Sequence, residues 1–464
     1  MLLTGIVIVY RHEITDMAVN MIESGKIIEI LNKYNSYWST GTISCGIRRD
    51  MLDSCTRQLD AKEILLLKGI RRSGKSTLMA QMIGALLEAG IRPVQILRVN
   101  LEEPLFSTDA SLDFLERIYR LYRDRICPAG RCYLFLDEIQ NIPEWERWVR
   151  GRNETEDIKI VLTGSSSELL SRETGTKLTG RHLSFTVFPL SFQEFLRFRN
   201  IMITSREDYY ANKPLVRHLF SEYLRYGGFP EVVLKEAVED KELLLWQYFE
   251  DIVYRDIVSK YGIRDAVTLR NLAVYLMTNI GRLTSISNLK KTFGVSQDKI
   301  ENYAAALLET CLAHRVSKFS WSLKRSLRER FNIYAVDTGL RNRVAFSFSE
   351  DSGWLVENVV LNFLKSQFEE IYFESNGGEI DFVIKEGVDL THRLQVWYAD
   401  PADTDIPERE LRCWTGSKTS HEEARPSRTE RIRNILITND LEKELVLGET
   451  KVECLPVILF LLGK

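Results

Sequence analysis

The stretch that decides the fold reads Gly69-Ile70-Arg71-Arg72-Ser73-Gly74-Lys75-Ser76-Thr77. It fits the pattern G-x-x-x-x-G-K-[ST], with an apolar run (64–68) before it and a helical pattern (76–88) after it. Glycines let the backbone curl so that successive N–H groups face one anion, and the following helix adds its positive end. A chance Gly/Lys turn would lack this context. The stretch therefore predicts a phosphate-binding loop between a buried strand and a helix.

Such a loop is expected to bind ATP together with Mg²⁺. Lys75 would supply a point charge for the β- and γ-phosphates, and Ser76 would place its hydroxyl on the metal. The nucleotide-binding set predicted from the motif comprises Gly69, Arg71, Arg72, Ser73, Gly74, Lys75, Ser76 and Thr77.

A second chemical feature is a pair of carboxylates at the end of the apolar run 132–136. In nucleotide hydrolases of this architecture, the first carboxylate, here Asp137, orders the Mg²⁺ shell with Ser76, and the second, Glu138, polarises the attacking water. Without further context, the same sequence could be two charged residues at a strand end that faces solvent. The phosphate loop upstream favours the catalytic interpretation, with Lys75 and Glu138 as catalytic residues.

The run 158–162 leads into Thr163-Gly164-Ser165-Ser166. A polar residue between the two carboxylates and the γ-phosphate would orient the water, and Thr163 or Ser165 could serve. A plain turn is the competing interpretation, and both stay open from the sequence.

Arg181 follows a stretch rich in Ser, Thr and Gly. An arginine that reaches the γ-phosphate can stabilise transition-state charge, from the same chain or from a neighbouring subunit. A surface arginine in an ion pair is the commoner fate. Arg71, Arg72 and Arg255 are rival candidates for this role.

Composition bounds the class of protein. The chain has 464 residues, 44% of them hydrophobic, and a formal net charge of −3, which excludes disordered and collagen-like chains and bulk polyanion binding. Seven scattered cysteines form neither a zinc pattern nor a secreted disulfide framework. No apolar run approaches the roughly 20 residues that a membrane helix needs. We therefore expect a cytoplasmic protein with reduced thiols and no membrane partner.

The pattern along the chain predicts four segments. Residues 1–46 read as an N-terminal extension with a helix, and 47–204 alternate strands and helices as a parallel α/β core does. Residues 205–345 are mostly helical. Residues 346–464 are mixed, with a charge-rich stretch, 401–431, that we expect to be a loop unless the reading frame has drifted there.

Several motifs in a fixed order resemble a prokaryotic family of AAA-type ATPases with a C-terminal domain of uncharacterised function. The marks are GIRRSGKST (69–77), YLFLDEIQNIPEWERWVR (133–150), LTGSSSELLS (162–171), LTGRHLSFTVFPLSFQEFL (178–196), YGGFPEVV (226–233), YFEDIVYRDIV (248–258), IYAVDTGLRN (333–342), WLVENVVLNFL (354–364) and GGEIDFVI (377–384). The match runs from about residue 24 to the end, except 401–431. Residues 1–20 are then an upstream extension or a misassigned start.

The resemblance implies an α/β AAA-type core with a parallel sheet, then a helical lid with a winged helix, then a small restriction-endonuclease-like domain. It also implies that the chain can form a homo-oligomer.

Residues 284–320 have the build of a winged helix, with Gly294 in the turn and Ser296 as the N-cap of the second helix. The second helix would expose Gln297, Lys299 and Asn302. A basic stretch follows, comprising Arg315, Lys318, Lys324, Arg325, Arg328, Arg330, Arg341 and Arg343. Double-stranded DNA could contact 284–343 through its phosphates. Such modules often bind protein instead, so both partners stay open.

A nuclease of the restriction-like fold needs an Asp and then E-x-K on the next strand. Asp381 is correctly placed and Glu357 could be the helix carboxylate, but Gln395 replaces the acid and Trp397 replaces the lysine. Gln is a poor ligand for a hard cation, and Trp cannot activate water. We therefore predict that this domain has no nuclease activity.

Together these features predict a Mg²⁺-dependent ATPase that works as a switch or motor on DNA or on a protein. The alternative is a DNA-binding regulator or scaffold that senses ATP with little turnover.

Overall fold

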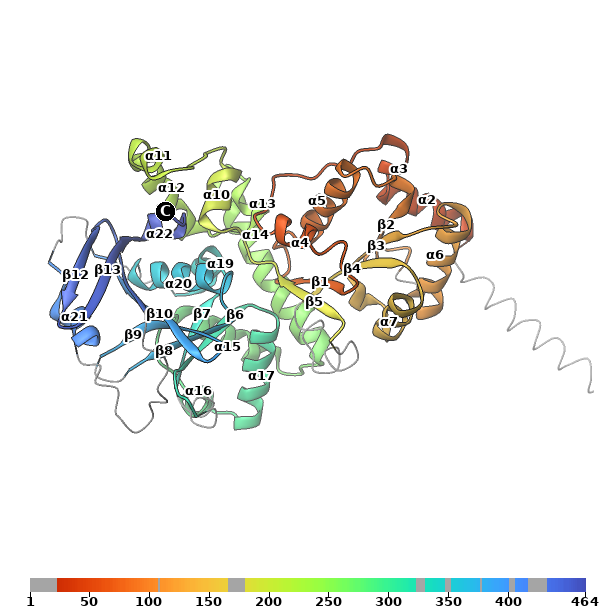
Figure 1. The fold of residues 1–464 in the computed structure, drawn as a ribbon. Coiled ribbons are helices and arrows are strands. Elements are labelled where there is room, and N and C mark those ends of the chain that lie inside the picture. The colour runs from red at the N-terminus through yellow and green to blue at the C-terminus, as the bar shows by residue number, and fades with distance from the viewer. Residues whose placement is uncertain are drawn as a thin grey trace, which may run out of the picture. The chain divides into compact units, whose positions relative to one another are not determined.

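The structure is a computed structural model, described for residues 23–106, 109–165, 180–322, 330–346, 352–375, 378–399, 405–415 and 432–464. The chain divides into two compact units (Figure 1). The first comprises Met1–Gly69 and Gly74–Val187, and the second comprises Ile70–Ser73 and Phe188–Lys464.

The described strands of the first unit form a parallel sheet in the order β2-β3-β4-β1-β5. Their bounds are β1 Ile64–Gly69, β2 Ile96–Asn100, β3 Cys132–Asp137, β4 Ile158–Ser165 and β5 His182–Thr186. The parallel α/β core predicted from the apolar runs is thereby confirmed, while β5 was not foreseen. Because all strands run the same way, their carboxyl ends meet at one edge of the sheet.

Helices cover both faces of this sheet. Leu65 and Leu67 of β1 pack in one core with α5 (Lys75–Glu88), α4 (Leu52–Thr56) and α3 (Tyr37–Thr40). Ile64 and Leu66 pack in another with α2 (Ser24–Tyr34), α6 (Leu112–Arg125) and α7 (Trp145–Thr155). Burial on both faces explains why the strands read as continuous apolar runs instead of alternating ones.

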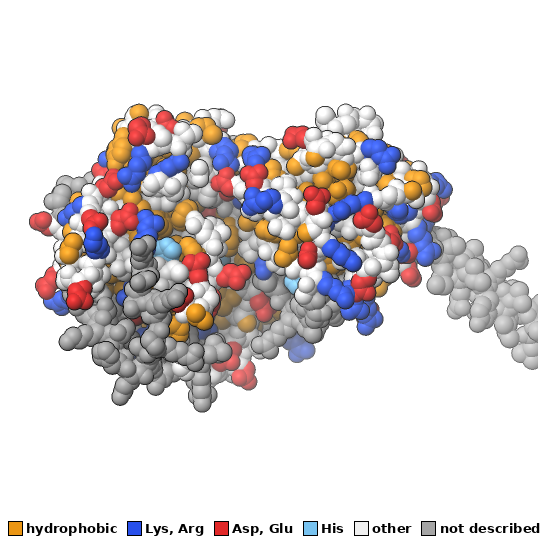
Figure 2. All heavy atoms as spheres, viewed as in Figure 1, with side chains coloured by type: hydrophobic (Ala, Val, Ile, Leu, Met, Phe, Trp, Pro, Cys, Tyr) orange, Lys and Arg blue, Asp and Glu red, His pale blue; other side chains and the backbone are white. Residues whose placement is uncertain are grey.

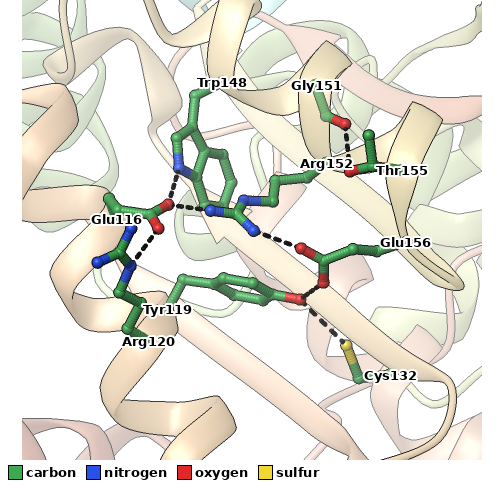
Figure 3. A network of polar contacts seen from close by, with 9 residues as sticks. All are labelled: Glu116, Tyr119, Arg120, Cys132, Trp148, Gly151, Arg152, Thr155 and Glu156. Atoms are coloured by element: carbon green, nitrogen blue, oxygen red, sulfur yellow. Dashed lines mark hydrogen bonds and ion pairs between the residues drawn. The ribbon is translucent and has the colours of Figure 1, made fainter.

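A polar network joins α6 to α7 (Figure 3). Arg152 of α7 forms ion pairs with Glu116 and Glu156, and its guanidinium lies 5.0 Å from the ring centre of Tyr119. Trp148 Nε1 donates a hydrogen bond of 2.8 Å to the same Glu116. Trp148 and Arg152 lie in or just after the family motif 133–150, so this part of the motif has a structural role.

The N-terminal segment 23–46, which we predicted to be part of an extension, belongs to this core. The Asn35 side chain accepts a hydrogen bond from Arg98 N (2.7 Å) and donates one to Arg98 O (2.8 Å). Because β2 is an edge strand, the Asn35 amide takes the place of a neighbouring strand. Trp38 Nε1 likewise donates to Ile96 O at 2.8 Å.

The described helices of the second unit lie before, between and after its strands. They are α10 Phe192–Phe198, α11 Arg206–Ala211, α12 Lys213–Tyr226, α13 Pro230–Val233, α14 Val238–Glu250, the π-helix η4 Asp251–Ser259, α15 Ala266–Thr278, α16 Ile286–Phe293, α17 Gln297–Glu309, α19 Thr338–Val344, α20 Ser352–Lys365, α21 Glu408–Thr415 and α22 Val457–Leu461. Ser296 accepts a hydrogen bond from Lys299 N, which confirms it as the N-cap of α17.

The described strands of this unit form one eight-stranded sheet in the order β12-β13-β11-β10-β9-β8-β6-β7. Their bounds are β6 Ala313–Lys318, β7 Phe331–Ala335, β8 Glu370–Glu374, β9 Ile380–Glu386, β10 Asp389–Trp397, β11 Arg433–Thr438, β12 Lys443–Leu447 and β13 Thr450–Pro456. The β6–β7 hairpin follows α16 and α17, and β6 pairs in parallel with β8. The predicted segments 205–345 and 346–464 are therefore joined in one sheet.

One sequence expectation for this unit is wrong. Within the predicted loop 401–431, residues Glu408–Thr415 form helix α21, and Cys413 and Trp414 are buried in the core beside Trp397. The many charged residues of α21 made the segment look like a loop by composition, so its buried apolar positions were missed. Residues 400–404 and 416–431 lie outside the described residues.

Two of the family motifs, 226–233 and 333–342, meet at the buried carboxylate of Asp337. Asp337 accepts hydrogen bonds from Gly228 N (2.6 Å) and, as N-cap of α19, from Leu340 N (2.9 Å). Asn342 donates to Leu224 O (2.9 Å) at the C-terminal end of α12. Burial raises the pKa of Asp337 to about 6. The contacts explain these motifs as a structural junction.

We predict that Gly339→Ala destabilises the second unit by at least ~2 kcal/mol, because a Cβ there would lie 2.0 Å from the backbone oxygen of Tyr226. Denaturant unfolding of the full chain measures the effect. Gly353→Ala in α20 is the matched control, since a Cβ there meets nothing within 4 Å. We expect it to leave stability unchanged or slightly raised. Equal behaviour of the two variants would contradict the role of this junction.

Candidate functional site

The predicted phosphate loop follows β1 and leads into α5. Gly69, Arg72 and Gly74 have positive φ angles of 152°, 67° and 97°. A Cβ at Gly69 would lie 2.2 Å from Val187 O, so glycine is required there by space as well as by conformation. The loop curls as the motif predicts, and α5 begins at Lys75 directly after it.

Lys75 and Ser76 point into the site. Lys75 is buried, and its Nζ donates to Gly69 O at 3.1 Å, across the loop. Ser76 Oγ donates to Asp137 Oδ1 at 3.0 Å. The structure therefore brings the start of α5 to the carboxyl end of β3, as the two motifs require.

Asp137 is only 2% exposed and accepts hydrogen bonds from three side chains. Ser76 and Thr163 donate to Oδ1, and Arg98 Nη2 donates to Oδ2 at 2.9 Å. Thr163 Oγ1 also accepts a hydrogen bond from Glu138 N at 2.9 Å. Thr163 thus links the two carboxylate residues. Ser165 and Ser166 cannot be compared with it, because their side chains lie outside the described residues.

Glu138 has left-handed backbone angles, φ 57° and ψ 52°. For a non-glycine residue this conformation costs about 1–3 kcal/mol, and such residues cluster at functional sites. Gln140 Nε2 donates to Glu138 Oε2 at 2.5 Å. The strained backbone turns Glu138 out of the β3 strand, next to Asp137.

Each of the two arginines of the loop has a carboxylate partner. Arg71 forms an ion pair of 3.9 Å with Asp256, and Arg72 one of 3.6 Å with Glu231. The phosphates would have to compete with these acids for either guanidinium. Ser73 is buried and Thr77 is exposed. The binding roles assigned to these four residues stay predictions.

Arg181 is the predicted site residue that the structure separates from the others. β1 and β5 are parallel with Ile64 opposite His182, so Arg181 lies beside the amino end of β1. The phosphate loop follows the other end, about 20 Å away at ~3.3 Å per residue. Arg181 forms an ion pair with Glu154. This position does not bring Arg181 to the phosphate loop of its own chain, and a role at the site of a neighbouring subunit stays a prediction. The rival Arg255 is an exposed residue of η4.

Sequence reasoning missed Arg98, which lies in β2 and belongs to no motif. Its side chain is 17% exposed and forms an ion pair with Asp137. The one available signal was a charged residue within a buried strand, Ile96–Asn100.

These residues fit magnesium-bound ATP. A buried ammonium, a hydroxyl and a carboxylate converge at a helix N-terminus, where anions bind, and oxygen donors are the ligands that Mg²⁺ prefers. No group of three or more His, Cys, Asp or Glu residues able to hold a metal occurs in the described part of the chain. That is compatible with Mg²⁺, which commonly binds through one or two carboxylates plus phosphates and water.

Comparisons with known proteins show the family of the chain and the domain type of its first unit. Residues 61–196 match the family model of an AAA domain, and residues 217–351 match a domain of unknown function (DUF8612). The chain is 31% identical to the uncharacterized protein MJ1544 of Methanocaldococcus jannaschii over 73% of this chain and 76% of that protein. The chain belongs to the same family as that protein. An uncharacterized protein of Haemophilus influenzae is 30% identical, with 77% of this chain and 88% of that protein covered.

The first unit of the chain is thus an AAA-type P-loop core. Among solved structures, the Aeropyrum pernix ORC1 protein in complex with DNA aligns with 63% of this chain and 90% of its own, at 13% identity and a TM-score of 0.30. A likeness at that level supports no inference about function. Within the described residues, no helix is both long enough and apolar enough to cross a membrane. All seven cysteines are described, and none forms a disulfide.

A second cluster of acids lies in the second unit, where the nuclease motif is degenerate. Gln395 Nε2 donates to Glu410 Oε2 (2.9 Å), and its Oε1 accepts from Asp381 N (3.2 Å). Asp381 Oδ2 accepts from Val396 N (2.8 Å), and Glu357 Oε1 accepts from Tyr334 OH (2.5 Å). Gln395, which stands where a nuclease would have an acid, thus forms structural hydrogen bonds. The absence of nuclease activity stays a prediction.

Burial and neighbouring acids raise the pKa values of Asp381 and Glu357. Burial, with the charges of Glu379 and Glu410, raises the pKa of Asp381 to about 8, although the Val396 hydrogen bond opposes the rise. Burial and the charge of Asp381 raise the pKa of Glu357 well above its usual value. A carboxyl with a raised folded-state pKa contributes stability at low pH that is lost as pH rises towards that pKa.

We predict that the second unit loses stability between pH 5 and pH 8, by up to about 1.4 kcal/mol per pH unit for each retained proton. Asp381→Asn keeps the acceptor for Val396 N and removes one titration. Its free energy of unfolding should therefore fall less steeply over this range. Denaturant unfolding at a series of pH values tests this. Glu449→Gln, at an exposed site, is the control and should keep the wild-type slope. Equal slopes for all three proteins would refute the assignment.

Proposed function

We propose that the chain is an ATP-hydrolysing AAA-type switch that acts on a protein partner through its second unit. The observation that carries the proposal is the linkage at Asp137. Ser76 of the phosphate loop and Thr163 of β4 share its Oδ1, and Thr163 also accepts from Glu138 N. Phosphate loop, metal-ordering carboxylate and candidate base are thereby held in one connected group.

Each residue then has a distinct task. Lys75 and the N–H groups at the start of α5 bind and orient the phosphates. When bound, Mg²⁺ would draw charge from the phosphate oxygens, with Ser76 and Asp137 as its protein contacts. Glu138 orients a water and accepts its proton, and Thr163 fixes the distance between Glu138 and Asp137.

The choice of a protein partner rests on the surface of α17. Lys299, which we expected to face DNA, donates to Asp265 at 2.6 Å, while Asp298 and Glu301 are exposed on the same helix. Acids on that face would repel a phosphate backbone. Figure 2 shows acidic and basic side chains intermingled on the visible face of the described residues.

The predicted basic stretch is also weaker than it reads in the sequence. Arg341 is 2% exposed and donates to Met277 O, and the guanidinium of Arg315 lies over the ring of Phe331 at 4.2 Å. Arg341 is thus too buried to contact DNA, which corrects the expectation for that residue, whereas Arg315 is only partly buried. Lys324, Arg325 and Arg328 lie outside the described residues.

Turnover of ATP by the purified full chain, beside Glu138→Gln, tests the proposal. We expect the variant to bind ATP as the wild type does but to release phosphate at least ~100-fold more slowly, because an amide cannot accept the proton. Duplex DNA should leave the wild-type rate unchanged. Stimulation by DNA would move the partner to nucleic acid. ATP binding without wild-type turnover would favour a sensor or scaffold.

Affinity for ATP tests the loop itself. Lys75→Ala should weaken binding about 10- to 100-fold, because a charge-assisted hydrogen bond to phosphate is worth ~1.5–3 kcal/mol. Titration calorimetry with Mg²⁺ and ATP measures this. Lys62→Ala is the matched control, since Lys62 is exposed and precedes the amino end of β1. Unchanged affinity in Lys75→Ala would contradict the site assignment.

A further inference from the structure

Arg98 occupies a position in the site that no motif assigns. It lies in the middle of the edge strand β2 and is paired in register with Phe135 of β3. Its guanidinium reaches the end of the neighbouring strand, where Nη2 donates to Asp137 Oδ2 at 2.9 Å. The two side chains are 17% and 3% exposed, so the pair is shielded from solvent and little weakened by salt.

The two oxygens of Asp137 have different kinds of partner. Oδ1 accepts from the neutral hydroxyls of Ser76 and Thr163, whereas Oδ2 faces the cation of Arg98. The carboxylate plane is therefore fixed from both sides. The hydroxyl side is the one that leads to the phosphate loop. The guanidinium supplies charge from the side away from Ser76.

The backbone of Arg98 is itself held in place. Asn35 bonds to both its N–H and its C=O, at 2.7 and 2.8 Å. The Nε of Arg98 is buried and has no hydrogen-bond partner. A buried donor without a partner costs stability. The guanidinium is therefore held at this cost in a position where Nη2 contacts Asp137.

We propose that Arg98 is a positioning residue that supplies the counter-charge of Asp137 before nucleotide arrives, so that Mg²⁺ binds only together with ATP. This rests on the proposed function of the same site. With the charge of Asp137 already balanced, one carboxylate and one hydroxyl are a weak site for a free hard cation. Phosphate oxygens add the ligands and the negative charge that make the metal bind.

The test measures thermal unfolding of the full chain without nucleotide, with and without about 5–10 mM free Mg²⁺. That concentration is high enough to occupy a weak site for a divalent cation. The wild type should show no shift with Mg²⁺. Arg98→Met leaves Asp137 buried without its cation, so we expect the transition of the first unit to fall by roughly 5–10 °C. Mg²⁺ should then restore part of that loss.

The double variant Arg98→Met, Asp137→Asn separates charge from packing. It should regain most of the lost transition temperature without Mg²⁺, because no charge is left to balance. It also serves if the single variant does not fold. Arg120→Met is the control, since Arg120 is exposed in its pair with Glu116. It should show a small loss with no Mg²⁺ response.

A lowered transition in Arg98→Met that neither Mg²⁺ nor Asp137→Asn recovers would overturn the proposal, as would an unchanged transition. A second readout is nucleotide affinity with Mg²⁺ against EDTA, where we expect the ratio to change at least several-fold in Arg98→Met. These measurements need no hydrolysis. Absent turnover would therefore refute the proposed function while leaving the role of Arg98 testable. Normal turnover together with a failed Arg98 test would refute only the role of Arg98.

Discussion

The buried negative charge of Asp137 organises the first unit. A carboxylate that is 2% exposed is tolerated only with partners for its charge and its lone pairs. Those partners come from three other elements of the first unit: Ser76 in α5, Thr163 near the end of β4 and Arg98 in β2. They can converge because parallel strands bring their carboxyl ends to one edge, where ligands of open α/β sheets bind.

The molecule balances buried carboxyls in three ways, and each has a different consequence. Asp137 faces a cation and stays available to a metal site. Asp337 accepts backbone N–H groups from Gly228 and Leu340, which makes it a fixed structural junction. Asp381 and Glu357 have raised pKa values, which follow from burial and from the charges of neighbouring acids. The balancing group, more than the acid itself, decides whether such a position can serve chemistry, architecture or neither.

Local patterns in the sequence predicted local structure well. Apolar runs marked β1 to β4, the loop motif marked its own backbone, and Ser296 marked the start of α17. What failed depended on contacts between distant residues. The parallel register of β5 with β1 removes Arg181 from the site, burial removes Arg341 from the basic surface, and the pairing of β6 with β8 joins two predicted segments. Arg98 was missed because its partner, Asp137, lies on another strand.

The family motifs therefore divide into two kinds, and only one kind bears on chemistry. The glycines at 227, 228 and 339 and the residues Asp337 and Asn342 are accounted for by contacts among themselves and with α12. Trp148 and Arg152 are likewise accounted for by the contacts between α6 and α7. Asp137 and Glu138 differ from these residues, since a buried charge and a left-handed backbone both cost stability. Residues kept at such a cost are the ones from which a function should be argued.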